Sequence, residues 1–148
     1  MEFKIKKITP SNPNYPASLK KIASPPKVLY LQGRFLARNE KCLAIVGTRR
    51  CSNYGKEIAF SFGKKLSEFS LTIVSGLARG IDTFAHQGAL AGNGRTIAVL
   101  ATGLDKDSIY PKENIQLAEK ILTQKGTLIS EYPPKTPGFK KTFLKETE

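Results

Sequence analysis

Two short stretches of this 148-residue chain combine arginine, glycine and hydroxyl residues in a way that suits phosphate binding. A planar guanidinium matches the geometry of a phosphate with two parallel hydrogen bonds. A glycine-rich turn between a strand and a helix directs backbone N–H groups and the positive end of the helix at an anion. The candidate anion-binding residues are Gly47, Thr48, Arg49 and Arg50 in the first stretch, and Ser75, Gly76, Arg79 and Gly80 in the second.

Each of these stretches follows a short apolar run and precedes a helical pattern. Residues 43–46 (LAIV) and 71–74 (LTIV) are typical of parallel strands that are buried on both faces. If these strands are neighbours, the two turns lie side by side at the carboxyl edge of a sheet, where open α/β sheets bind ligands. The alternative is that Gly76 and Gly80 only permit a tight turn, and the recurrence of the pattern at two places argues against it.

Strand and helix patterns alternate along the remaining chain. Strands are predicted at 27–33, 94–100 and 126–131, and helices at 53–69, 81–91 and 113–124. This alternation predicts an α/β protein with a parallel sheet. In the first helix we expect Ile58, Phe62, Leu66 and Phe69 to pack on the sheet. Residues 1–27 are rich in Pro, Ser and Asn and are expected to be irregular.

The net charge of +12 favours a polyanionic partner. Residues 1–50 hold 11 basic against 2 acidic residues, whereas residues 51–148 hold 13 against 10. We find no basic amphipathic helix, so nucleic acid is favoured over a membrane surface. Tyr54, in the first turn of a predicted helix, either stacks on a base or packs beside its own strand. The chain lacks the apolar segment of a signal peptide, and a cytoplasmic location is expected.

Asp82 and His86 lie four residues apart and share a face of the predicted helix 81–91. A catalytic pair is disfavoured because no Ser or Cys nucleophile accompanies them. We instead expect Asp82 to orient the glycine-rich turn, and we expect no enzymatic activity. The chain has no Walker-type loop and no Gly-x-Gly-x-x-Gly, so no nucleotide cofactor is predicted.

Metal ligands are not indicated by the spacing of the candidate side chains. Asp105 and Asp107 lie in an irregular loop, where such pairs are usually solvated. Cys42 and Cys51 have no partners at zinc spacing and are expected to be free thiols. No metal is therefore predicted.

Many motifs, in order from about residue 8 to residue 143, closely resemble the DNA-processing protein A (DprA, also called Smf) family. The ten-residue run 73–82 is the most specific of them. The matching motifs are Ile45-Val46-Gly47-Thr48-Arg49, Ser52-Asn53-Tyr54-Gly55, residues 73–82, His86, Gly88-Ala89-Leu90, Thr96-Ile97-Ala98-Val99-Leu100, Gly103-Leu104-Asp105, Tyr110-Pro111 and Ser130-Glu131-Tyr132-Pro133-Pro134.

This resemblance implies a Rossmann-like sheet with helices on both faces that binds single-stranded DNA. It implies that Arg49, Lys140 and Phe143 contact the strand, with Phe143 stacked on a base. Help in loading the RecA recombinase during natural transformation is a further implication, as are RecA and a second copy of the chain as partners.

The carboxyl end departs from the family pattern. Glu146-Thr147-Glu148 stands where the family has Arg-Asn, and the carboxyl half of the family's domain is missing. We expect segments 1–40 (an irregular entry with one strand), 41–134 (the Rossmann-like core) and 135–148 (a flexible, truncated tail). Part of the sheet should then expose apolar residues. Two alternatives remain: a nucleotide-binding or nucleotide-processing Rossmann-like protein, and a truncated remnant without function.

Overall fold

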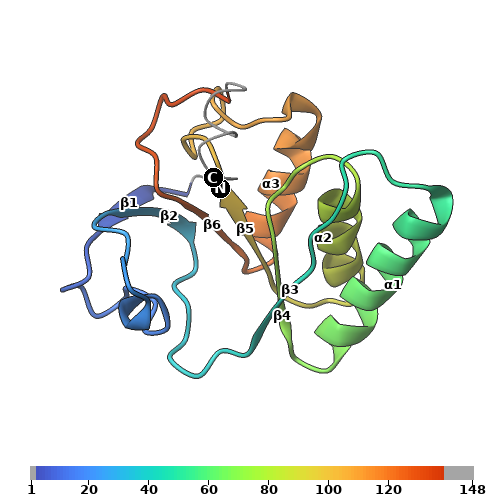
Figure 1. Ribbon diagram of the computed structural model, residues 1–148, viewed down its shortest axis with the longest axis horizontal. Helices are drawn as coiled ribbons and strands as arrows, with labels where there is room; N and C mark the ends of the chain where they lie inside the picture. Colours follow the sequence, from blue (N-terminus) through green and yellow to red (C-terminus); the bar gives the residue numbers. More distant parts are fainter. Residues whose placement is uncertain (1–2, 139–148) are drawn as a thin grey trace.

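The computed structural model describes residues 3–138, which form a six-stranded sheet with its helices (Figure 1). Along the sheet the strands follow the order β1-β2-β6-β5-β4-β3. The strands are β1 (Ile5–Ile8), β2 (Leu29–Gly33), β3 (Cys42–Ala44), β4 (Thr72–Ser75), β5 (Thr96–Leu100) and β6 (Thr127–Ser130). The α-helices are α1 (Asn53–Glu68), α2 (Ile81–Ala91) and α3 (Ile115–Thr123), and η1 (Leu19–Lys21) and η2 (Lys112–Asn114) are single 3-10 turns.

The sheet has a parallel part and an antiparallel part. β3, β4, β5 and β6 are parallel neighbours in chain order, each joined to the next through a helix. This confirms the α/β, Rossmann-like prediction. β2 pairs antiparallel with β6, and β1 pairs antiparallel with β2, so the whole sheet is mixed. No helical crossover joins β1 to β2 or leads into β3, and nothing forces these two strands into the parallel direction.

The first strand lies in a region that the sequence predicts to be irregular. Ile5–Ile8 pairs with β2 from Ile5 opposite Gln32 to Ile8 opposite Leu29. The strand has only four residues, two of them lysines, and its partner comes more than twenty residues later. Its pairing is therefore long-range and leaves little local signal.

The helices α1, α2 and α3 lie on one face of the sheet, to the right of the strands in Figure 1. Right-handed crossovers between strands that are consecutive in the sheet place the helices on the same side. On this face Ile73, Ala98 and Leu128 are buried. They pack in two clusters with Ala85 and Ala89 of α2 and with Leu117 and Ile121 of α3.

The other face is covered by the amino-terminal segment instead of by long helices. Ile97 and Ile129 are buried there with Leu31, beneath Tyr15 and the chain around η1. The sequence predicts helices on both faces of the sheet. On this face the described part of the chain has only the 3-10 turn η1. Toward the carboxyl ends of the strands, Val99 of β5 and Val46, which follows β3, are exposed, as expected for a sheet with an incompletely covered face.

Helix α1 packs through smaller residues than its apolar pattern suggests. Phe62 and Phe69 are exposed, and the buried positions are Ala59, Gly63 and Ser67. The reason is close contact with α2: a Cβ on Gly88 would lie 2.1 Å from the Phe60 carbonyl oxygen. Bulky side chains cannot occupy such a contact, so Phe62 turns outward, whereas Leu66 is partly buried against the cluster of Ile73, Ala85 and Ala89, as predicted.

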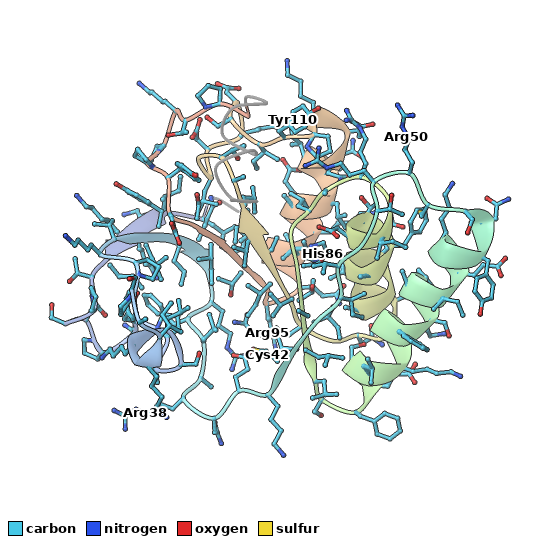
Figure 2. The ribbon with its side chains drawn as sticks, in the orientation of Figure 1. Arg38, Cys42, Arg50, His86, Arg95 and Tyr110 are labelled. Carbon is cyan, nitrogen blue, oxygen red and sulfur yellow. The ribbon has the colours of Figure 1, made fainter. Side chains whose placement is uncertain are left out.

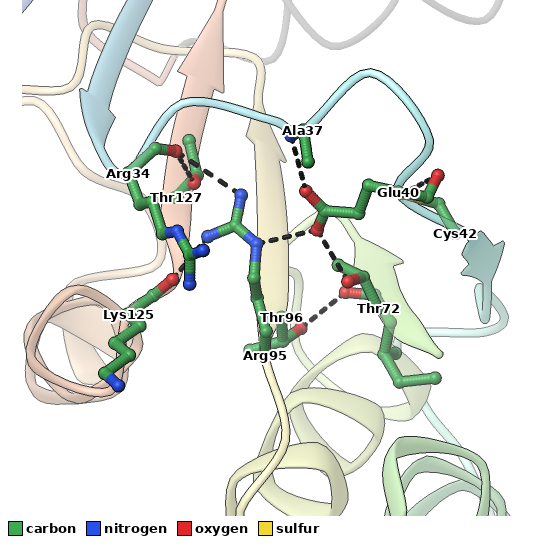
Figure 3. Close-up of polar contacts among 10 residues, drawn as sticks. Arg34, Ala37, Glu40, Cys42, Thr72, Arg95, Thr96, Lys125 and Thr127 are labelled. Carbon is green, nitrogen blue, oxygen red and sulfur yellow. Dashed lines mark hydrogen bonds and ion pairs between the residues drawn. The ribbon is translucent and has the colours of Figure 1, made fainter. Parts of the chain in front are cut away.

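A nearly buried ion pair ties the loop between β2 and β3 to the amino-terminal ends of the other strands (Figure 3). Arg95 Nε donates to Glu40 Oε2 at 2.6 Å, and the two side chains are 13% and 12% exposed. Glu40 also accepts hydrogen bonds from Thr72 Oγ1 (2.6 Å) and Ala37 N–H (3.1 Å). Arg95 donates further to the carbonyl oxygens of Lys125 and Arg34. Burial acts to raise the pKa of Glu40, but the hydrogen bonds from Arg95, Thr72 and the Ala37 N–H hold it below its usual value.

Candidate nucleic-acid interface

The two glycine-rich turns are joined directly at the carboxyl edge of β3 and β4. Their strands are parallel neighbours, and Ile81 N–H donates to the Thr48 carbonyl oxygen at 3.2 Å. Gly80 has φ +80, and a Cβ there would lie 2.3 Å from the same oxygen. Only glycine permits both this backbone conformation and this approach. The contact places Arg49 next to Arg79, confirming that the turns lie side by side.

The second turn uses its polar groups within the protein. Ser75 Oγ donates to the Ile45 carbonyl oxygen at 2.6 Å, and Gly76 N–H donates to Asp82 Oδ2 at 3.0 Å. The expectation that Ser75 and Gly76 cradle a phosphate is therefore revised, because these groups already have partners. Asp82 is buried and makes the contact that an orienting role requires.

His86 is fully buried and is also bonded within the protein (Figure 2). Its Nε2 accepts a hydrogen bond from Leu77 N–H at 3.3 Å. Thr96 Oγ1 donates to the Ile73 carbonyl oxygen, so the 2.7 Å contact between Thr96 Oγ1 and His86 Nδ1 uses the Nδ1 proton. Burial lowers the pKa of His86 to about 3, and the ring is neutral. His86 thus supports the second turn from beneath.

The first turn presents its side chains outward. Arg50 is exposed and points away from the ribbon in Figure 2. Arg50 N–H donates to Thr48 Oγ1 at 3.2 Å, which fixes the local path of the chain. Gly47 faces Ile81, where a Cβ would approach the side chain to 2.7 Å. Gly47 and Thr48 therefore shape the turn that carries the two arginines.

A depression of about 360 Å³ lies at this edge of the sheet. Four basic side chains line it, and among the described residues that line it Glu113 is the one acidic side chain. The basic residues are Arg49, Arg50, Lys56 and Arg79. A larger groove of about 860 Å³ between β1 and α3 is lined mainly by apolar side chains and contains none of these arginines. Charge therefore makes the smaller depression the candidate anion site.

Arg79 has partners of its own in this depression. Its Nη2 and Nε donate to Glu113 Oε1 at 2.8 and 3.1 Å, and its Nη1 donates to the Tyr110 hydroxyl at 3.1 Å. The guanidinium also lies 5.3 Å from the centre of the Tyr110 ring. The hydrogen bonds between Arg79 and Glu113 lower the pKa of Glu113. The same bonds, together with the one to Tyr110, raise the pKa of Arg79.

Sequence reasoning missed Lys56 and Glu113 as members of the site. Lys56 lies in the first turn of α1, after the Ser52 cap, with its Nζ 5.6 Å from the centre of the Phe84 ring. The available signal was its place in the first turn of the predicted helix, six residues after Arg50. Glu113 meets Arg79 from 34 residues away, and no local pattern indicates such a contact.

Two predicted DNA contacts, Lys140 and Phe143, lie outside the described residues. The first part of the predicted tail is bonded to the core: Lys135 N–H donates to Asp105 Oδ1 at 2.7 Å, and Gly103 N–H donates to the Thr136 carbonyl oxygen at 2.8 Å. Asp105 therefore caps backbone groups. In residues 3–138 no cluster of three or more His, Cys, Asp or Glu could hold a metal. No helix in that part of the chain is long and apolar enough to cross a membrane.

The fold and the site define a Rossmann-like α/β protein with a basic depression at the carboxyl edge of its sheet. The profile described as DNA recombination-mediator protein A matches residues 6–146. The chain is 47% identical over 130 residues to Protein Smf of Synechocystis and 41% identical over 128 residues to the DNA processing protein DprA of Bacillus subtilis. The chain belongs to this DprA/Smf family.

Solved structures agree with this assignment. DNA processing protein A from Streptococcus pneumoniae superposes with a TM-score of 0.79 at 36% identity, covering 95% of this chain and 48% of the other. The Helicobacter pylori protein, described by its single-stranded DNA binding mode, gives 0.75 at 30% identity, covering 95% and 62%. The alignments to the Synechocystis and Bacillus proteins cover 85% of this chain but only 32% and 42% of those relatives.

Proposed function

We propose that this protein binds single-stranded DNA at the carboxyl edge of its parallel strands. The observation that carries the proposal is the convergence of Arg49, Arg50, Lys56 and Arg79 on one depression from two turns and a helix. Such a cluster suits the regularly spaced phosphates of a strand. The single-stranded DNA binding of the Helicobacter relative supports the same ligand.

In this proposal Arg49 and Arg50 contact phosphates of the strand. Both follow strand β3 on a turn that the second turn and Ile81 hold in place. Tyr54 lies in the first turn of α1 and is 72% exposed, so packing beside its strand does not explain it. Stacking on a base is the role that this exposure favours. Lys140 and Phe143, which the family resemblance implies as contacts, would extend the same path.

Binding without chemical turnover is part of this proposal. Asp82 and His86, the two side chains that most resemble an acid–base pair, are bonded to Gly76, Leu77 and Thr96. Neither is presented to a ligand as a base beside a nucleophile. The charged groups that line the depression are four cations and Glu113, and the role proposed for the cations is to hold an anion without activating it.

The wider role proposed here is that of the family: assisting the loading of the RecA recombinase on incoming DNA during natural transformation, in the cytoplasm. The support is membership of the DNA recombination-mediator family and the motifs along the chain. RecA and a second copy of the chain are the protein partners of this proposal.

The direct test is a titration of purified protein into fluorescent single-stranded and double-stranded oligonucleotides at two salt concentrations. We expect preference for the single strand and an affinity that falls with salt, with a slope of about 0.7 per phosphate contact. Equal affinity for both forms would contradict the single-strand proposal. No binding at low salt would contradict DNA binding altogether.

A further inference from the structure

We propose that Glu113 is an internal competitor for Arg79, which a DNA phosphate must displace, and that it makes the site selective for a phosphate strand over single small anions. This inference rests on the proposed function, because it names the residue that sets the specificity of the same depression.

The hydrogen bonds show that Glu113 occupies one edge of Arg79 at which a phosphate can bind with two hydrogen bonds. Oε1 of Glu113 accepts from both Nε and Nη2 of Arg79, and these nitrogens form one edge of the guanidinium fork. That edge is a bidentate donor for a phosphate or a carboxylate. The Tyr110 hydroxyl accepts from Nη1 on the other side. A phosphate can gain the bidentate edge only after Glu113 leaves it.

Exposure indicates that the pair can open. The Arg79 and Glu113 side chains are 46% and 60% exposed, so water can solvate both charges when they separate. Exposed ion pairs are worth little to stability. The buried pair between Arg95 and Glu40 differs, since those side chains are 13% and 12% exposed. Opening the Arg79–Glu113 pair at the depression therefore costs little free energy. Opening the Arg95–Glu40 pair at the other end of the sheet costs much more.

Selectivity follows from the number of cations that a ligand reaches. A small anion that displaces Glu113 exchanges one partner of Arg79 for another. A strand that also contacts Arg50 or Lys56 reaches cations other than Arg79, the arginine to which Glu113 is bonded. Glu113 thus weakens the binding of single phosphates at Arg79 more than the binding of a strand.

The experiment compares Glu113→Gln with Glu119→Gln, each alone and combined with Arg79→Gln. Glu119 is the matched control, because it is an exposed acid on α3 that pairs with Lys106 at the β1–α3 groove. We expect Glu113→Gln to bind a single-stranded oligonucleotide about two- to fivefold more tightly. When Arg79→Gln is also present, the gain in DNA affinity from Glu113→Gln should be no larger than the gain from Glu119→Gln. Equal gains from the two Gln variants, or a gain that survives loss of Arg79, would overturn the inference.

A second measurement uses inorganic phosphate and does not depend on DNA binding. The NMR signal of the Arg79 Nε–H group, assigned by its loss in Arg79→Gln, is followed during phosphate titration. We expect it to respond at lower phosphate concentration in Glu113→Gln than in the unmodified protein. An equal response in both proteins would contradict the competition even if DNA binds. If phosphate gives the expected difference and the oligonucleotide does not bind, the proposed function fails while the competition stands.

Discussion

The Thr48 carbonyl oxygen accepts a hydrogen bond from Ile81 N–H at 3.2 Å, and this bond joins the two glycine-rich turns. It gives the first N–H of α2 a partner within the protein, although such groups at a helix start are often left for a ligand. The Ile81 N–H is therefore already used within the protein, and the candidate anion site rests on the arginine side chains that these turns hold together.

Replacing Gly80 with alanine should separate the two turns. The new Cβ would meet the Thr48 carbonyl oxygen, and φ +80 with ψ −130 is a conformation that alanine adopts only with strain. We expect a loss of about 2 kcal/mol or more in the free energy of unfolding, measured with urea, together with weaker DNA binding. Gly55→Ala is the control, because a Cβ there makes ordinary contacts at 3.4 Å and the position is helical. A variant Gly80→Ala as stable as Gly55→Ala would contradict this description of the turns.

Replacing Arg95 with methionine should destabilise the protein without acting on the anion site. The change leaves the carboxylate of Glu40 nearly buried without its cation, at the end of the strands opposite to Arg50 and Tyr110 (Figure 2). Removing one partner of a buried pair costs about 3 kcal/mol, to be measured by urea unfolding. Lys106→Met, which breaks an exposed pair, should change stability by less than about 0.5 kcal/mol. Equal effects of the two changes would show that the Arg95 network adds nothing.

His86 should make stability depend on pH in mildly acidic solution. Its pKa is about 3 in the folded protein and near 6.5 in an unfolded chain, so the unfolded state binds an extra proton between these values. The histidine contribution is complete above about pH 6.5 and is lost as pH falls toward 3. We expect the free energy of unfolding to be about 1.4 kcal/mol lower at pH 5.5 than at pH 7.5.

The readout for this prediction is unambiguous, because His86 is the one histidine of the chain. Its imidazole NMR signals should not titrate between pH 7.5 and 5.5 in the folded protein. A titration midpoint near 6.5 under native conditions would mean that the ring is accessible and that its contacts with Leu77 and Thr96 are not maintained.

Local patterns predicted the elements that have strong periodicity or clear boundaries. Helix 81–91 begins and ends where expected, because Gly80 and Gly92 bound it. The predicted helix 53–69 ends within one residue of α1. The direction of β2 and the existence of β1 depend on pairing between distant segments. Of the residues that the apolar stripe of α1 predicted to face inward, Leu66 packs on the core, whereas Phe62 and Phe69 are exposed because small residues form the close contact with α2.

The candidate site was predictable where it follows strand ends. Arg49 lies in the turn that follows β3 and Arg79 in the turn that follows β4, and these neighbouring parallel strands bring the two arginines together. The prediction that both strands are buried on both faces was wrong for β3, whose three residues are exposed because it is the edge strand of the sheet. The hydrogen bonds that withdraw Ser75 and Gly76 from ligands arise from Ile45 and Asp82, and these depend on the final positions of the chain. The contact of Glu113 with Arg79 is of the same long-range kind.

The central claim, that the turn after β3 holds the DNA backbone, is tested most directly by Arg49→Ala. Single-strand affinity is measured at several salt concentrations for the unmodified protein, Arg49→Ala and Lys20→Ala. Lys20 is the control because it lies on η1, in the segment beneath the other face of the sheet. We predict that Arg49→Ala weakens binding more than Lys20→Ala and lowers the salt slope by about 0.7. An unchanged isotherm for Arg49→Ala would contradict the claim.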